Sequence, residues 1–113
     1  MKQQTTWTVP ATVLRVIDGD TLEVACDLGF RITYRAKVRL QGINCPELPT
    51  EAGLTARGFT IHYLGFRAGV LPPQVTVTSH SLDKYGRVLG EVTTADGPLS
   101  VALVNAGHAV AAK

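Results

Sequence analysis

The sequence has only two cysteines, few aromatic residues and no long apolar run, and each scarcity excludes a class of protein. No stretch approaches the ~20 apolar residues of a membrane-spanning helix, so we expect no membrane partner. The polar first residues lack the apolar run of a secretory signal, so we expect a cytoplasmic protein. Because 113 residues suffice for one core but not for two, we predict a single domain, 9–113, after a polar tail, 1–8.

The two cysteines, Cys26 and Cys45, do not form a CxxC pair, and neither has a histidine at the spacing of a metal ligand. This pattern argues against the Cys/His clusters that hold zinc. We interpret both residues as free thiols in a reducing compartment. The alternative, a disulfide between them, would require export of the protein.

The charge is also modest, because a formal net charge of +2 does not by itself identify a nucleic-acid-binding protein. Its distribution is more informative. Side chains on a strand alternate between two faces, and residues 31–40 alternate strictly between apolar and polar positions. The cations on one face are Arg31, Arg35, Lys37 and Arg39, and the apolar face holds Ile32, Tyr34, Ala36, Val38 and Leu40. For the first three cations, a solvated strand surface and a track for a polyanion both remain open.

Alternation of apolar and polar residues predicts five strands along the chain. They lie at residues 9–17, 21–26, 31–40, 74–79 and 88–94. Turn signals separate neighbouring strands, most clearly the Asp-Gly pair of the first hairpin.

Two helices are predicted as well. The first spans residues 51–67, with Thr50 as its N-cap, although three glycines lower its helix propensity. The second is short, with Pro98 in its first helical position and Gly107 at its C-terminal cap. Their expected buried stripes are Ala52, Ala56, Phe59 and Tyr63 in the first helix, and Leu99, Ala102, Leu103 and Ala106 in the second.

The order of these elements predicts the fold class. A mainly β (α+β) chain with three strands, a helix, two strands and a short C-terminal helix matches the five-stranded Greek-key barrel called the OB-fold. In that architecture a helix commonly lies between strands 3 and 4, where the first helix falls.

Three turns or loops carry polar residues suited to chemistry: Asp18-Gly19-Asp20-Thr21, Asn44 to Glu47, and Asp83-Lys84-Tyr85-Gly86-Arg87. Carboxylate, amide and carbonyl oxygens suit a hard cation such as Ca²⁺, and the planar fork of arginine matches two phosphate oxygens. Ordinary turn chemistry also accounts for Asp-Gly pairs and for a polar hairpin. Each motif alone therefore leaves both interpretations open.

Together, the motifs resemble those of the staphylococcal nuclease-like (thermonuclease) family over about Val13 to Ala109. The resemblance implies an OB-fold barrel and a Ca²⁺-dependent nuclease that hydrolyses DNA and RNA to 3′-phosphate products with little sequence specificity. The matching segments are Ile17-Asp18-Gly19-Asp20-Thr21, Arg39-Leu40 through Pro46-Glu47, Asp83-Lys84-Tyr85-Gly86-Arg87 and Ala102-Leu103-Val104-Asn105-Ala106-Gly107.

The resemblance also implies roles for individual residues. Asp20 is similar in position to a Ca²⁺ ligand, and Cys45 to a residue that contributes its backbone carbonyl. Glu47 resembles the residue that positions or deprotonates the attacking water. Arg39 and Arg87 resemble the pair that grips the scissile phosphate, where a cation and two guanidinium groups neutralise charge in the transition state.

Further residues are implied in metal and substrate binding. Asn44 stands where the family usually has an aspartate ligand, so we expect weaker Ca²⁺ binding, with a Kd of roughly 10⁻⁴–10⁻³ M or above. Lys84 and Tyr85 are candidates for contacting a terminal phosphate and sugar. Arg35 and Lys37 extend the candidate track for the polymer.

Two other functions compete with a nuclease. The first is a non-catalytic OB module that binds nucleic acid through its basic strand, in which Asn44 marks a decayed metal site. The second is a protein-interaction domain that retains the fold and uses its surface for a partner.

Overall fold

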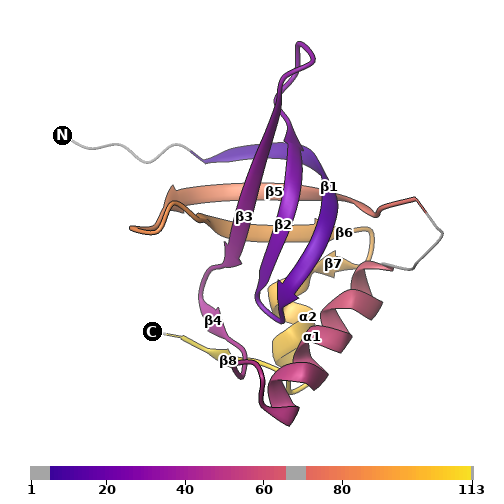
Figure 1. Ribbon diagram of the computed structural model, residues 1–113, viewed down its shortest axis with the longest axis vertical. Coiled ribbons are helices and arrows are strands. Elements are labelled where there is room, and N and C mark those ends of the chain that lie inside the picture. The colour runs from indigo at the N-terminus through magenta and orange to yellow at the C-terminus, as the bar shows by residue number, and fades with distance from the viewer. Residues whose placement is uncertain (1–5, 66–70, 113) are drawn as a thin grey trace.

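The computed structural model of the chain describes residues 6–65 and 71–112 (Figure 1). Five long strands and two helices form most of it, and three strands have only two residues each. The long strands are β1 (Trp7–Asp18), β2 (Thr21–Asp27), β3 (Thr33–Leu40), β5 (Gln74–Leu82) and β6 (Val88–Thr94); the short ones are β4 (Ile43–Asn44), β7 (Gly97–Pro98) and β8 (Val110–Ala111); the helices are α1 (Glu51–Leu64) and α2 (Leu99–Asn105).

The long strands form a closed five-stranded barrel. They pair antiparallel in the order β3-β2-β1-β5-β6, and a short parallel pairing between Val38–Leu40 of β3 and Val88–Gly90 of β6 closes it. Along the chain, helix α1 comes between β3 and β5, the third and fourth barrel strands, and α2 follows β6, the fifth. The predicted OB-fold is therefore confirmed.

The barrel interior holds the hydrophobic core. Strand alternation turns one side chain in two inward, and α2 adds two leucines. The largest fully buried apolar side chains are Val13, Leu22, Val24, Val38, Leu40, Val77, Val92, Leu99 and Leu103. Both helices lie at the same end of the barrel (Figure 1), so the β1–β2 turn and the loop after β3 meet α1 there.

One part of the strand prediction is wrong, because β3 begins at Thr33 and its first residues lie outside the core. Ile32 and Tyr34, expected to face the core, are 53% and 49% exposed. Arg31 lies in the preceding turn, with a φ of 64°. The β2–β3 hairpin extends past the other described strands, so none of them covers its tip (Figure 1).

The helix predictions require smaller corrections. Helix α1 ends at Leu64, and Gly65 caps it with a φ of 78°; the predicted end at Arg67 lies outside the described residues. Of the predicted stripe, Ala56 is buried, Phe59 and Tyr63 pack partly buried against the core, and Ala52 is exposed; α1 also buries Gly53, Thr60 and Leu64. Pro98 is the N-cap of α2 rather than its first helical residue, and Ala106 is the exposed C-cap.

The structure also bears on the chain ends and on membrane crossing. Strand β1 begins at Trp7, which pairs with Ser79, so two residues of the predicted tail belong to the barrel. Strand β8 pairs with β4 and ties residues 110–111 to the loop after β3. In the two described stretches, no helix has the length and apolarity that crossing a bilayer requires.

Candidate active site

The three polar motifs meet in one pocket of about 460 Å³ at the end of the barrel nearest α1. Every residue predicted to take part in catalysis or metal binding lines it. The lining residues are Asp18, Asp20, Thr21, Arg39, Asn44, Cys45, Pro46, Glu47 and Arg87. Segments that are far apart in the sequence thus form a single polar concavity.

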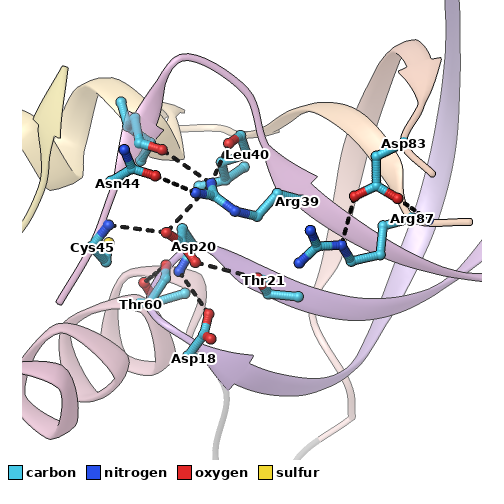
Figure 2. A network of polar contacts seen from close by, with 12 residues as sticks. Asp18, Asp20, Thr21, Arg39, Leu40, Asn44, Cys45, Thr60, Asp83 and Arg87 are labelled. Carbon is cyan, nitrogen blue, oxygen red and sulfur yellow. Dashed lines mark hydrogen bonds and ion pairs between the residues drawn. The ribbon is translucent and has the colours of Figure 1, made fainter. Parts of the chain in front are cut away.

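Arg39, near the end of β3, is the centre of the pocket's polar network (Figure 2). Its Nη1 donates to the carbonyls of Leu40 at 2.6 Å and Ile43 at 3.0 Å, and lies 3.3 Å from Oδ2 of Asp20. Its Nη2 donates to Oδ1 of Asn44 at 2.5 Å. The guanidinium therefore links the β1–β2 turn to the loop after β3.

Asp20 is buried, with 6% of its surface exposed, and its carboxylate is held from two sides. The backbone N–H of Cys45 donates to Oδ2 at 2.9 Å, and the hydroxyl of Thr21 donates to Oδ1 at 3.2 Å. Burial, followed by the neighbouring Asp20 carboxylate, raises the pKa of Asp18. Two carboxylates in one turn make this end of the pocket acidic.

The surroundings of the Cys45 thiol disfavour its thiolate form. Burial, followed by the charges of Asp20 and Asp18, raises its pKa to about 11. Both cysteines are free thiols, as predicted. The observed contact of Cys45 with the site is its backbone N–H, which fixes Asp20.

Side chains of helix α1 donate hydrogen bonds to the β1–β2 turn and to the end of β1. The sequence did not indicate this role. The fully buried hydroxyl of Thr60 donates to the carbonyl of Gly19 at 2.7 Å, and Nε of Arg57 donates to the carbonyl of Val16 at 3.1 Å. A Cβ at Gly19 would lie 2.9 Å from Sγ of Cys45. This turn therefore packs too closely for a side chain.

Replacing Thr60 with valine is expected to lower the free energy of unfolding by about 1–3 kcal/mol. Valine preserves the shape but leaves the Gly19 carbonyl without its donor. Urea unfolding monitored by circular dichroism measures the change. Thr55→Val is the control, because the hydroxyl of Thr55 donates on the exposed side of the same helix. Equal losses in the two variants would contradict the role given to Thr60.

Asp83 fixes the conformation of the β5–β6 turn and the direction of Arg87. Its Oδ1 accepts the backbone N–H groups of Tyr85 and Arg87, both at 2.9 Å, and its Oδ2 accepts Nε of Arg87 at 2.7 Å. Burial raises the pKa of Asp83, but these hydrogen bonds outweigh it and leave the pKa below its usual value. Figure 2 shows the two terminal nitrogens of Arg87 directed away from Asp83.

The predicted substrate contacts lie around the pocket rather than in it. Tyr85 is 72% exposed, with Nζ of Lys84 at 5.3 Å and Cζ of Arg87 at 5.5 Å from its ring centroid. This geometry is typical of cation–π contacts. Tyr85 therefore presents an aromatic surface beside Arg87.

The basic positions on β3 are only partly available to a polyanion. Nε of Arg35 lies 3.1 Å from Glu23, which also pairs with Arg15 at 2.9 Å. The hydrogen bond from Arg15 is the main cause of the lowered pKa of Glu23, and Lys37, opposite it on β3, adds to the effect. Arg35 is thus directed to a carboxylate and not to the pocket.

The predicted Ca²⁺ site would combine carboxylate, amide and backbone carbonyl oxygens. Within residues 6–65 and 71–112, no group of three or more His, Cys, Asp and Glu side chains is placed to hold a metal ion. Asp20 and Asn44 do lie in one pocket, joined through Arg39. Sequence reasoning found these residues but not the Arg39–Asn44 contact, nor the supports from Thr60 and Asp83.

The fold and the pocket define an OB-fold protein with two arginines, a glutamate and an acidic turn in one site. Comparison with known families identifies its family. Residues 37–113 match the family described as "Staphylococcal nuclease homologue", and the chain belongs to that family. The matched range includes Arg39, Glu47 and Arg87 but begins after Asp20, which lines the same pocket.

Two curated relatives show the same kinship. An "Uncharacterized endonuclease" of Escherichia coli is 36% identical over 85 residues, which are 75% of this chain and 48% of the relative. A "Micrococcal nuclease" of Shigella flexneri is 40% identical over 80 residues, which are 71% of this chain and 40% of the relative. The chain thus spans less than half the length of these relatives.

Proposed function

We propose that the chain is a metal-dependent nuclease that hydrolyses phosphodiester bonds of DNA and RNA with little sequence preference, with Ca²⁺ as its metal. One observation carries the proposal: Arg39, Arg87, Glu47 and Asp20, from separate segments, line a single pocket. Family membership supports a phosphodiester substrate, since the relatives are named as nucleases.

The arginines suit an anionic substrate. Asp83 contacts Arg87 through Nε, and no described residue pairs with its terminal nitrogens, so they can form a bidentate pair with phosphate oxygens. Arg39 reaches the same pocket and would exchange its Asn44 contact for the phosphate. Two guanidinium groups stabilise the charge that develops on the oxygens of the diester in the transition state.

Glu47 is the candidate base. It is exposed, lines the pocket and has no ion pair with any described residue, so its carboxylate is open to a water molecule. A positioned general base typically contributes about 10²–10⁴-fold to a rate. The Cys45 thiol, with its raised pKa, does not compete for this role.

The donor chemistry fits a hard cation. Carboxylate oxygens of Asp20 and the amide oxygen of Asn44 are of the type that Ca²⁺ prefers, and the carbonyl of Cys45 is a further candidate ligand. When bound, Ca²⁺ supplies positive charge that polarises the phosphoryl group. The pair of side chains carries one formal negative charge, which favours weak binding.

The end groups of the products test this proposal. Digestion of 5′-labelled single-stranded DNA and RNA should leave 3′-phosphates, detected as a mobility shift of the labelled fragments after treatment with a phosphatase specific for 3′ ends. Products with 5′-phosphate and 3′-hydroxyl ends would show that the other P–O bond of the diester is cleaved, and would contradict the proposal. A preference limited to one short sequence would contradict the low specificity.

Replacing Asn44 with aspartate is expected to tighten Ca²⁺ binding by about tenfold or more, because the number of charged ligands controls affinity in such sites. Isothermal titration calorimetry with CaCl₂ measures it on the purified protein. Asn105→Asp is the control, since Asn105 ends α2 and does not line the pocket. An unchanged Ca²⁺ affinity in Asn44→Asp would remove Asn44 from the ligand set.

A second function, nucleic-acid binding without cleavage, has an observation in its favour. Asn44 holds Arg39 through the oxygen that would otherwise meet a cation, and the described residues offer no cluster of three acidic or His/Cys ligands. Binding that weakens steeply with salt, without cleavage at any Ca²⁺ concentration, would favour this function over the nuclease.

A further inference from the structure

The segment that connects Glu47 to helix α1 is short and is held by hydrogen bonds. Only Leu48 and Pro49 separate Glu47 from Thr50, the N-cap of α1. The carbonyl of Glu47 accepts the Thr50 hydroxyl at 2.5 Å and the Thr50 backbone N–H at 3.2 Å. The Thr50 hydroxyl in turn accepts the backbone N–H of Gly53 at 3.0 Å. The same hydroxyl therefore caps the helix and holds the backbone of Glu47.

Gly53 also packs against that backbone. It is buried, although Ala52 and Leu54 on either side of it are exposed. A Cβ at Gly53 would lie 2.3 Å from the carbonyl oxygen of Glu47 and 2.6 Å from its carbonyl carbon. These are backbone atoms, so they cannot rotate away as the end of a flexible side chain would.

Gly58, in the same helix, differs in this respect. A Cβ there would meet nothing within 4 Å. Glycine within a helix lowers its stability relative to alanine, and among the described residues no close contact at Gly58 requires a glycine. At Gly53 the loss has a structural reason, because the first turn of α1 packs directly against Glu47.

We propose that Gly53 and Thr50 are positioning residues for Glu47: the glycine admits the Glu47 backbone against α1, and the threonine hydroxyl fixes it there. The inference rests on the proposed role of Glu47 as the base. In this proposal the first turn of α1 sets the position of the Glu47 carboxylate at the pocket. A side chain at residue 53 would therefore displace that carboxylate.

The test compares Gly53→Ala with Gly58→Ala. A misplacement of about 1 Å can cost about 10²-fold in rate, so Gly53→Ala should lower kcat by about that factor. KM for single-stranded DNA should remain unchanged, because Arg39 and Arg87 stay in place. Gly58→Ala should keep kcat and raise Tm. Equal kcat values in the two variants would overturn the inference.

A second pair of variants covers the case in which Gly53→Ala does not fold. Thr50→Val removes the hydroxyl and should lower kcat, whereas Thr50→Ser retains it and should preserve kcat. In a Glu47→Gln background, Thr50→Val should cause no further loss of kcat, since the group that it positions is already gone. A full additional loss there, or equal activity of the valine and serine variants, would contradict the inference.

A readout without activity separates this inference from the proposed function. The backbone amide resonances of Glu47 and Leu48 should shift in Gly53→Ala or Thr50→Val and stay in place in Gly58→Ala. If they shift while Glu47→Gln still cleaves DNA, the geometry holds and the role of Glu47 as base fails. If Glu47→Gln is inactive but neither resonance shifts, the positioning inference alone fails.

Discussion

Replacing Arg39 with lysine is expected to lower kcat/KM for single-stranded DNA by about 10²–10³-fold, the usual cost of removing one preorganised donor to transition-state charge. The guanidinium of Arg39 contacts Asp20, Asn44 and two backbone carbonyls. An ammonium group is a point charge and cannot reach several acceptors with a planar fork. Steady-state cleavage of a labelled oligonucleotide measures the loss.

Arg15→Lys is the matched control for Arg39→Lys. Arg15 pairs with Glu23 outside the pocket, and its side chain is 62% exposed. The control should retain kcat/KM, because exposed ion pairs contribute little and the charge is kept. If Arg39→Lys retained activity as well as this control does, the pocket around Arg39 would not be the site of cleavage.

Replacing Glu47 with glutamine is expected to lower kcat by about 10²–10⁴-fold, because the amide keeps the shape but cannot accept a proton. Folding stability should not change, since the Glu47 side chain is exposed and makes no ion pair with a described residue. Single-turnover kinetics at saturating enzyme measure the chemical step, and thermal unfolding checks the fold.

Glu51→Gln is the control for Glu47→Gln. Glu51 is also exposed, lies four residues further along the chain and does not line the pocket. Its variant should cleave at the wild-type rate. Similar losses in the two variants would indicate a general effect of negative charge near α1, and the assignment of Glu47 as the base would be wrong.

The fold was predictable because local patterns carried most of its information. Asp18 to Thr21 marks a hairpin, and β6 has the predicted limits, residues 88–94. The exposure of Ile32 and Tyr34 was not predictable from alternation. Alternation states which side chains share a face, but not how far a hairpin extends past its neighbours.

The residues that line the pocket were predictable as a set, but their contacts were not. The resemblance of their segments to a known family singled out Asp20, Arg39 and Glu47. The contact between Arg39 and Asn44, and the support of the β1–β2 turn by Thr60, depend on packing between distant segments.

Gly53 illustrates the same limit most clearly. In the sequence it only lowers the helix propensity of α1, whereas in the structure it packs against the carbonyl of Glu47. A propensity scale describes how a residue affects the stability of its own helix. It does not account for contacts with the backbone of another segment. The contact became visible only with both segments in place.

The central claim is that the pocket holding Arg39, Glu47 and Arg87 cleaves phosphodiesters with the help of Ca²⁺. The most direct measurement is digestion of single-stranded DNA by the purified protein at millimolar Ca²⁺, with and without a chelator, beside Glu47→Gln prepared identically. We predict cutting that the chelator stops and that Glu47→Gln lacks. Cutting that persists in the chelator, or is equal in Glu47→Gln, would contradict the claim.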